Sequence, residues 1–350
     1  MKLMQILLSQ SEAGAETYFE KVAYAFSKDD SIQQRLVIEA QVSREKRLEK
    51  AGVDYRTLPM DKFGKIFLYN NFLKRYVSDF DPDLIVTWVN RASRKCPKSS
   101  AIVVGRLGGY YDINNYRKCD HLIVNTPDLV RHVVANGWSQ DHVSMISNFG
   151  ELPESLDLLE PIPSIPEGSR VLLTLGRLHV KKGQDILIKA LPKIPNTTLL
   201  IAGDGELKDE LISLARSAGV LDRVFFLGLR KDIRHLFDLA DVCVFPSRFE
   251  PLGNVILEAW ATKTPLVAAA SQGPSWLVEH EKDGLLFEID NVEQCAKQVN
   301  RVLNDRCLAA KIVEQGVQKF EMRFSMNVII NQYRQLFDQL INEKGKAGLK

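Results

Sequence analysis

The chain has 350 residues, of which 45% are hydrophobic and 26% are charged, with 21 Gly and 14 Pro. This composition is typical of a folded globular protein and excludes a disordered, fibrous or collagen-like chain. Lys and Arg total 46 and Asp and Glu total 44, a net charge of +2 that disfavours a dedicated nucleic-acid-binding protein. The length is about twice that of a common domain, so two domains are expected.

The cysteines and the apolar segments indicate a cytoplasmic protein. The cysteine count is odd and no C-x-x-C pair occurs, which disfavours a disulfide framework and a thiolate zinc site. The apolar segment Leu3–Leu8 is too short for a signal peptide core, and no apolar run reaches the roughly 18 residues that span a membrane. The five cysteines are Cys96, Cys119, Cys243, Cys295 and Cys307.

Short apolar runs alternate with helical periodicity through the first half of the chain. Such runs suit parallel strands that are buried on both faces of a sheet. Between the first two runs, Tyr18, Val22 and Phe26 recur at helical spacing. The predicted strands are Leu3–Leu8, Arg35–Ile38, Tyr55–Leu58, Leu84–Trp88, Ala101–Val104, His121–Val124 and Val143–Ile146.

A proline-rich stretch, Glu151–Gly168, is the best linker candidate, and the alternation restarts after it. We therefore predict an α/β protein of two Rossmann-like, doubly wound domains, residues 1–160 and 168–324, that face a central cleft. The amphipathic segment Ser325–Asn342 predicts a helix that returns to the first domain, so that residues 325–350 belong to it. The predicted strands of the second domain are Val171–Leu175, Thr198–Ala202, Val224–Leu227, Val242–Phe245, Leu266–Ala269 and Leu285–Phe287.

Several well-known motifs are missing from the sequence. It has no Walker A motif, no H-E-x-x-H, no G-x-S-x-G, and no G-x-G-x-x-G after the first strand. Asp79, Asp81 and Asp83 fit a D-x-D metal pattern, but they directly precede a predicted strand beside Pro82, where acidic residues commonly mark a turn. We favour the turn and predict no metal site.

The segment Asp241–Trp260 is the most informative part of the chain. A buried strand ends at Pro246, a polar loop follows, and a helix is expected to begin near Pro251 or Leu252. The backbone amides of Gly253, Asn254 and Val255 would then face outward at the helix start, where a phosphate is favoured. Glu258 shares the face of Asn254 by i, i+4 spacing, and its carboxylate could accept two hydrogen bonds from a ribose diol.

Two further loops carry candidate groups. Gly176–Gly183 leaves the first strand of the second domain, and its Arg177 and Lys182 could neutralise a diphosphate, including the charge that builds as it leaves. Gly14 follows the first strand of the chain and offers close backbone approach across the cleft. Each group also has a plain structural reading: Glu250 as a helix-start charge, Gly14 as a turn residue, and the others as solvated surface charges.

Taken together, these segments resemble the retaining GT-B glycosyltransferases known as glycosyl transferases group 1. The resemblance rests on Gly176-Arg177 with Lys182-Gly183, on Gly203–Glu206, and on Glu250 and Glu258 with Pro251, Gly253 and Asn254 between them. It covers nearly all of the second domain. The first domain matches mainly through Ala13–Glu16 and Ile146–Asn148.

The resemblance implies a role for each matched residue. Glu258 would bind the ribose, and Arg177 and Lys182 would bind the diphosphate. Glu250 and the backbone of Gly253–Val255 would hold the transferred sugar. The base would lie near Leu229 and Arg230. One departure concerns the loop after the fifth strand, where many members have a histidine: here it reads Gly105–Asp112 without one. Arg106 or the amides of Gly108 and Gly109 are the candidates for the acceptor side.

The implied function is a cytoplasmic, metal-independent, retaining glycosyltransferase. It would move a sugar from a UDP- or GDP-sugar to the hydroxyl of a glycan or glycolipid, in bacterial cell-surface polysaccharide or lipopolysaccharide assembly, with no cofactor and no nucleic acid. The basic stretch Arg91, Arg94, Lys95 and Lys98 could touch the inner membrane surface, although a solvated loop is the favoured reading. Two rivals stay open: a nucleotide-sugar epimerase of the same architecture and a catalytically inactive nucleotide-sugar-binding protein.

Overall fold

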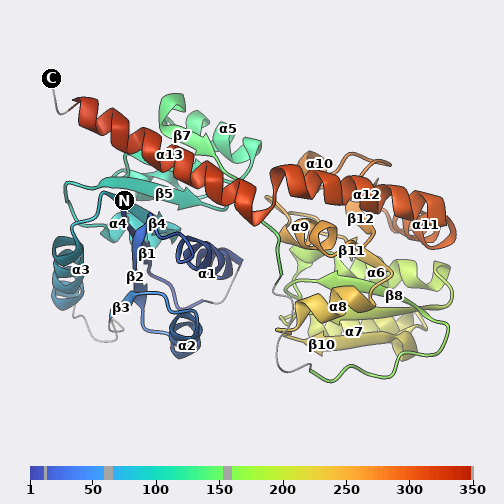
Figure 1. The fold of residues 1–350 in the computed structure, drawn as a ribbon. Helices are drawn as coiled ribbons and strands as arrows, with labels where there is room; N and C mark the ends of the chain where they lie inside the picture. The colour runs from blue at the N-terminus through green and yellow to red at the C-terminus, as the bar shows by residue number, and fades with distance from the viewer. Residues whose placement is uncertain (12–13, 59–65, 153–159, 348–350) are drawn as a thin grey trace. The chain divides into compact units, whose positions relative to one another are not determined.

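The chain forms two compact units, each built on one parallel sheet with helices around it (Figure 1). A computed structural model describes residues 1–11, 14–58, 66–152 and 160–347. Unit 1 comprises Met1–Asn148 and Ile329–Lys350, and unit 2 comprises Phe149–Val328. Residues 153–159 of the proline-rich stretch that was predicted as the linker lie outside the described residues.

The sheet of unit 1 has seven parallel strands in the order β3-β2-β1-β4-β5-β6-β7. This order reverses direction between β1 and β4, which is the switch point where doubly wound sheets commonly bind ligands. β4 and β5 are buried along their whole length, which is consistent with their largely apolar sequences. The strands are β1 Lys2–Leu7, β2 Gln33–Glu39, β3 Tyr55–Leu58, β4 Leu84–Trp88, β5 Ile102–Leu107, β6 His121–Val124 and β7 Val143–Met145.

Five helices of unit 1 connect these strands, with a short 3-10 turn η1 (Ile113–Tyr116) before β6 and another, η2 (Gln140–His142), before β7. Thr126 caps the helix that follows β6, and proline at its first position suits a helix start. The helices are α1 Gly14–Phe26, α2 Val42–Lys50, α3 Ile66–Phe80, α4 Val89–Lys95 and α5 Pro127–Ala135.

Unit 2 repeats the plan with six parallel strands in the order β10-β9-β8-β11-β12-β13. Its switch point therefore lies between β8 and β11. The strands are β8 Arg170–Leu175, β9 Thr197–Ala202, β10 Val224–Gly228, β11 Val242–Phe245, β12 Leu266–Ala269 and β13 Leu285–Phe287.

The helices of unit 2 fill the connections between its strands and then run on toward the C-terminus. Trp260 in α9 is fully buried, and its indole nitrogen donates to the carbonyl of Asp283 at 2.8 Å. The helices are α6 Gln184–Ala190, α7 Lys208–Ser217, α8 Ile233–Leu239, α9 Asn254–Ala261, α10 Gln272–Leu277, α11 Val292–Asn304 and α12 Arg306–Arg323, with 3-10 turns η3 Val180–Lys182, η4 Leu191–Lys193 and η5 Leu221–Arg223.

The last helix, α13 (Met326–Ala347), packs against unit 1 (Figure 1). Tyr333 and Phe337 are fully buried, and both rings contact Phe26 of α1 at centroid distances of 6.1 and 6.0 Å. The hydroxyl of Tyr333 accepts a hydrogen bond from Nε of Arg106 in β5 at 2.9 Å. The prediction that this helix returns to the first domain is confirmed, because burying its apolar face requires a partner.

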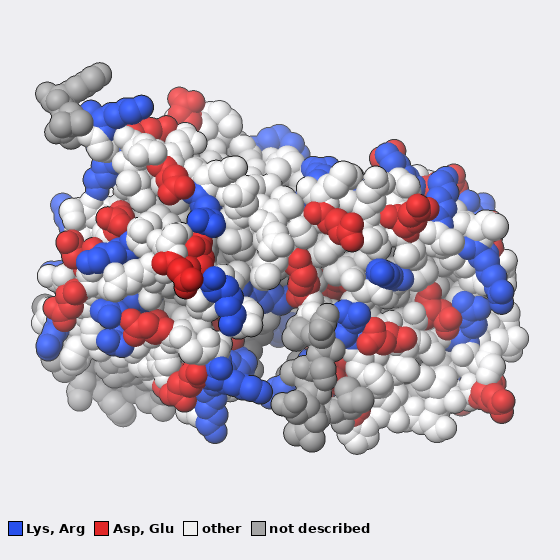
Figure 2. All heavy atoms as spheres, viewed as in Figure 1, with Lys and Arg blue, Asp and Glu red and all other residues white. Residues whose placement is uncertain are grey.

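The predicted two-sheet α/β architecture is confirmed, and the seven and six predicted strands correspond to the two sheets. In the D-x-D segment, Asp79 lies in the last turn of α3, and Asp81 and Asp83 lie in the short connection to β4, where Asp81 has a φ of 47° and Asp83 accepts a hydrogen bond from the amide of Lys2 at 2.7 Å. Charged side chains of both signs are interspersed over the face shown in Figure 2. Within the described part of the chain, no helix combines the length and apolarity needed to cross a membrane.

Candidate functional site

Two loops at the switch point of unit 2 carry four of the predicted site residues: Arg177, Lys182, Glu250 and Gly253. One loop, 176–183, follows β8 and the other, 246–253, follows β11, and these two strands are neighbours in the sheet. Gly183 brings the loops together: its φ is 67°, and a Cβ atom there would lie 2.1 Å from the carbonyl oxygen of Pro246. Only glycine permits this approach, so the sequence Lys182-Gly183 sets the distance between the loops.

Lys182 and Glu250, predicted for the diphosphate and the transferred sugar, meet directly. The Nζ of Lys182 lies 2.5 Å from Oε2 of Glu250, and their side chains are 28% and 16% exposed. The ammonium group also lies over the ring of Phe245, 6.0 Å from its centroid. A partly buried pair of this kind is stronger than a surface ion pair, since less water screens it. The pair joins the two loops at their centre.

Arg177 lies in the same loop but is far more accessible. Its side chain is 71% exposed, and NH2 lies 3.4 Å from Oε2 of Glu206. The other carboxylate oxygen of Glu206, Oε1, lies 3.5 Å from Nε2 of His179. Ion pairs this exposed contribute little to stability. The guanidinium is therefore held only loosely and can turn to an anionic ligand at small cost.

Helix α9 begins at the end of the second loop, two to three residues after the predicted start near Pro251 or Leu252. Gly253 is its N-cap with a φ of 98°, and its first turn begins at Asn254. Asn254, Val255 and Glu258 are half-buried, whereas Ile256 and the next residue, Leu257, are fully buried. The three predicted donor residues thus share the less buried side of the helix, consistent with i, i+4 spacing.

Buried polar groups gather at the same edge of the sheet. Gln184, Ser247 and Ser271 follow β8, β11 and β12, and all are at most 2% exposed. Within the described residues, Oε1 of Gln184 and the hydroxyls of both serines lack a hydrogen-bond partner. Native proteins rarely leave such groups unsatisfied, and functional sites are a common exception.

Leu229 and Arg230, predicted near the base, behave differently from each other. Leu229 is 79% exposed just after β10, whereas the side chain of Arg230 is only 3% exposed. Arg230 binds Asp232 at 2.6 and 2.8 Å, and it donates to the carbonyls of Glu160 and Pro161 at 2.8 and 2.9 Å. Its guanidinium therefore holds in place the chain that leads into β8.

The predicted acceptor-side residues lie at the carboxyl end of β5 in unit 1. Arg106 is buried: NH2 donates to Oδ1 of Asn148 at 2.6 Å, Nε donates to Tyr333, and NH1 donates to the carbonyl of Leu107. These contacts give Arg106 a structural role within unit 1. Gly108 and Gly109 follow in the turn after the strand.

The loop after β1, which leads to the predicted Gly14, is held by an arginine that sequence reasoning missed. Arg44 of α2 is fully buried, and its NH1 and NH2 donate to the carbonyls of Ser9 and Ser11 at 2.7 and 2.6 Å. Its Nε donates to Glu20 at 2.9 Å. In the sequence Arg44 stands in an ordinary charged helix, so nothing in the local pattern marks it.

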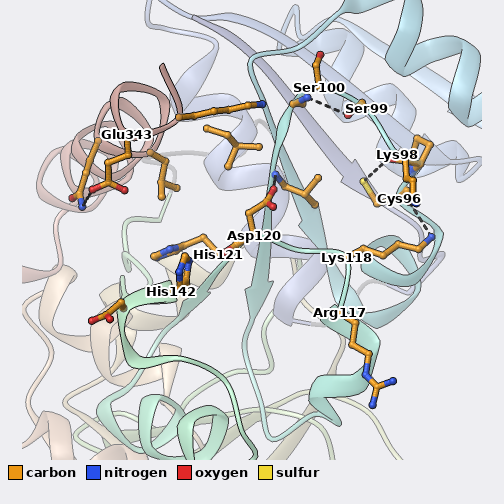
Figure 3. Close-up of a pocket in the computed structure, with 18 residues that line it drawn as sticks. Cys96, Lys98, Ser99, Ser100, Arg117, Lys118, Asp120, His121, His142 and Glu343 are labelled. Atoms are coloured by element: carbon orange, nitrogen blue, oxygen red, sulfur yellow. Dashed lines mark hydrogen bonds between the residues drawn. The ribbon is translucent and has the colours of Figure 1, made fainter. Parts of the chain in front are cut away.

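A hollow of about 1090 Å³ in unit 1 lies at the other edge of the sheet (Figure 3). It is lined by the amino-terminal ends of β5 and β6, by His142 before β7, and by Gln339–Lys344 of α13. Burial, with a contribution from His142, lowers the pKa of His121 to about 4, so that this imidazole is neutral near pH 7. Because open parallel sheets bind ligands at the carboxyl ends of their strands, the hollow is not the candidate active site.

Comparisons with known proteins agree with this geometry. A family described as "Glycosyl transferases group 1" matches residues 157–319. The lipopolysaccharide core biosynthesis glycosyltransferases LpsE and LpsD of Rhizobium meliloti (strain 1021) are each 31% identical to the chain, over 93% and 97% of it and 96% and 98% of their own lengths. The crystal structure of Anabaena Alr3699/HepE in complex with UDP and glucose superposes with a TM-score of 0.80 at 23% identity, covering 97% of this chain and 100% of that one. With its two doubly wound units and its full-length similarity to LpsE and LpsD, the chain belongs to the group 1 glycosyl transferases and has the GT-B fold.

Proposed function

We propose that the protein is a retaining glycosyltransferase that moves a sugar from a nucleoside-diphosphate sugar to an acceptor hydroxyl. The contact between Lys182 and Glu250 carries the proposal, because it brings a cation suited to phosphate and a carboxylate suited to sugar hydroxyls together at the switch point of unit 2. This arrangement suits the transfer of a sugar from its donor, with a nucleoside diphosphate as the leaving group.

Lys182 and Arg177 would bind the diphosphate. The β-phosphate gains negative charge as the bond to the sugar breaks, and two cations beside it stabilise that charge. The start of α9 adds its backbone amides and its dipole. These groups supply what a metal ion supplies in other transferases, so we propose that no metal is needed. Among the described residues, no three His, Cys, Asp or Glu side chains group as metal ligands would.

Glu258 and Leu229 would bind the nucleoside. Glu258 would accept the ribose hydroxyls, and the exposed Leu229 would lie against the base. Strand β9 separates β10 from β8, so their carboxyl ends lie about 10 Å apart at the usual strand spacing. That span suits a ligand whose base and diphosphate lie at opposite ends.

Glu250 would hold the transferred sugar through its hydroxyls, and its charge would stabilise positive charge at the anomeric carbon. Retention of configuration rests on the resemblance to the family. The donor is proposed to be a UDP-sugar, because Alr3699/HepE was solved with UDP and glucose, with a GDP-sugar as the alternative.

Unit 1 would bind the acceptor, with the turn at Gly108 and Gly109 as the proposed contact. The names of LpsE and LpsD, lipopolysaccharide core biosynthesis glycosyltransferases, support an acceptor in the lipopolysaccharide core. Contact with the anionic surface of the inner membrane would use Arg94 and Lys98, which are exposed, and Lys74 of α3; these three residues line a second hollow of unit 1. Sedimentation with vesicles that contain anionic lipid tests this contact.

One experiment tests the proposed function as a whole. Purified protein is incubated with a panel of nucleotide sugars, with and without lipopolysaccharide core acceptors, and the nucleotide products and the anomeric linkage are measured by NMR. Release of nucleoside diphosphate with an α-linked product from an α-linked donor supports the proposal. Formation of an epimeric nucleotide sugar without acceptor would indicate the epimerase, and saturable binding without turnover would indicate an inactive binding protein.

A further inference from the structure

Arg248 connects the two loops of the candidate site through most of its polar atoms. NH1 and NH2 bind the two carboxylate oxygens of Asp185 at 2.7 and 2.8 Å, and NH1 also donates to the carbonyl of Val180 at 2.8 Å. Nε donates to Asp290 at 2.5 Å, and the backbone amide donates to the carbonyl of Lys181 at 2.8 Å. Two residues of loop 176–183 and the first turn of α6 are thereby tied to loop 246–253.

The ion pair between Lys182 and Glu250 also joins these loops, but it cannot be what holds them during the reaction. Under the proposed function both side chains contact the donor, so their mutual contact must loosen when phosphate oxygens compete for Lys182. The contacts of Arg248 lie on Asp185, Asp290 and backbone carbonyls, none of which is assigned to the donor. They can persist while Lys182 changes partner.

We propose that Arg248 is a positioning residue, which keeps Glu250 at its working distance from Lys182 by clamping the two loops together. This inference rests on the proposed function, since it assigns Lys182 and Glu250 to the donor. The forked guanidinium suits the task, because two parallel hydrogen bonds to one carboxylate fix orientation as well as distance. An ammonium group would supply the charge without that orientation.

The contacts within the clamp keep Asp185 and Arg248 ionised. Burial disfavours the ionised form of Asp185, but the hydrogen bonds and charges of Arg248 and Lys189 outweigh it, and the pKa of this carboxyl stays below its usual value. Hydrogen bonds to Asp185 raise the pKa of Arg248, against the effect of its own burial. The clamp is therefore ionised over the whole neutral range.

The test compares three clamp variants with a matched control. Arg248→Gln and Asp185→Asn remove the forked pair, and Arg248→Lys keeps the charge. Lys189→Ala is the control, since Lys189 binds the same carboxylate at 3.1 Å but does not touch loop 246–253. We expect kcat to fall about tenfold to a hundredfold in Arg248→Gln and Asp185→Asn and less in Arg248→Lys, with nucleoside diphosphate affinity within about threefold of the parent.

Hydrogen–deuterium exchange of the 246–253 segment separates the clamp from the proposed function. Faster exchange in Arg248→Gln than in Lys189→Ala supports the clamp even if the parent transfers no sugar, in which case only the proposed function fails. Any of three results would refute the clamp. The first is a parental kcat and a parental exchange rate in Arg248→Gln, and the second is a loss of kcat in Lys189→Ala as large as that in Arg248→Gln. The third is a joint fall of kcat, nucleotide affinity and melting temperature in Arg248→Gln. If Arg248→Gln does not fold, Arg248→Lys and Asp185→Asn decide by the same measurements.

Discussion

The carboxyl edges of the two sheets follow one plan but present different chemistry. In unit 1 the loop after β1 is held by Arg44, which is fully buried and bound to two backbone carbonyls. In unit 2 the loops after β8 and β11 are held by Arg248, whose side chain is 23% exposed, beside the accessible charges of Arg177, Lys182 and Glu250.

This difference between the two edges indicates that charged side chains stabilise the fold at one edge and are available to a ligand at the other. At the edge of unit 1, the buried side chains of Arg44 and Arg106 donate their hydrogen bonds to other groups of the protein. The edge of unit 2 keeps cations and carboxylates within reach of solvent, as the proposed nucleoside-diphosphate donor would require. Changes at the first edge should therefore alter stability, and changes at the second should alter binding and turnover.

The largest expected effect is on the stability of unit 1. Arg44→Ala removes a buried cation, leaves two carbonyls without donors, and should lower the free energy of unfolding by about 3–5 kcal/mol. Arg47→Ala is the matched control, because Arg47 binds the same Glu20 but is 44% exposed and should cost less than about 1 kcal/mol. Urea unfolding measures both. Equal losses in the two variants would contradict the role given to Arg44.

The next largest effect should be on turnover. Glu250→Gln removes the charge that is proposed to stabilise the anomeric carbon, so the rate should fall about tenfold to a thousandfold, roughly 1.4–4 kcal/mol. Nucleoside diphosphate affinity should stay at the parental value or rise, since Lys182 loses its competing carboxylate.

Rate, nucleotide affinity and melting temperature should be measured on one preparation of Glu250→Gln, with the exposed Glu314 of α12 changed to Gln as a control. Near-normal turnover would mean that Glu250 is only a structural charge. Weakened nucleotide binding would mean that the roles of Glu250 and Glu258 are exchanged.

Nucleotide affinity should respond to Glu258. Glu258→Ala removes the carboxylate proposed for the ribose, and the lost charged hydrogen bonds should weaken binding of the nucleoside diphosphate by roughly 1.5–3 kcal/mol. Calorimetry on the free nucleotide checks this value, with Glu314→Ala as the control. Unchanged affinity in a folded Glu258→Ala protein would remove Glu258 from the nucleotide site.

A smaller effect is expected at acid pH. The folded-state pKa of Asp185 is lowered, so its pairing contributes stability that is complete above the unfolded pKa, about 3.9, and is lost as the pH falls through the folded value. Asp185→Asn should thus be less stable than the parent by about 1 kcal/mol near pH 6, and the gap should close toward pH 2. Urea unfolding across this range measures the gap. A gap independent of pH would show that Asp185 acts through shape alone.

No effect is expected from chelation. If Arg177, Lys182 and the start of α9 carry the charge of the leaving diphosphate, transfer should continue at the parental rate in excess EDTA. Initial rates with and without EDTA, followed by added magnesium or manganese, provide the measurement. Activity that disappears with the chelator and returns with the metal would overturn the metal-independent mechanism.

Sequence by itself determined the architecture and indicated where the candidate site lies. Continuous apolar strands such as Leu84–Trp88 can only be buried on both faces, so their alternation with helical segments implied parallel sheets, and parallel sheets direct attention to the loops after their strands. The i, i+4 spacing of Asn254 and Glu258 likewise predicted the side of α9 that they share.

Tertiary structure decided which charges are available. Arg177 and Arg230 look alike in the sequence, each one or two residues beyond a strand, yet one is 71% exposed and the other is 3% exposed and bound to Asp232 and two carbonyls. Arg248 and Asp185 are 63 residues apart and become one ion pair only when β8 and β11 lie side by side. The local sequence pattern indicates how residues are spaced along one helix or strand. The burial of a charged side chain and the choice of its partner depend on elements that meet only in the folded chain.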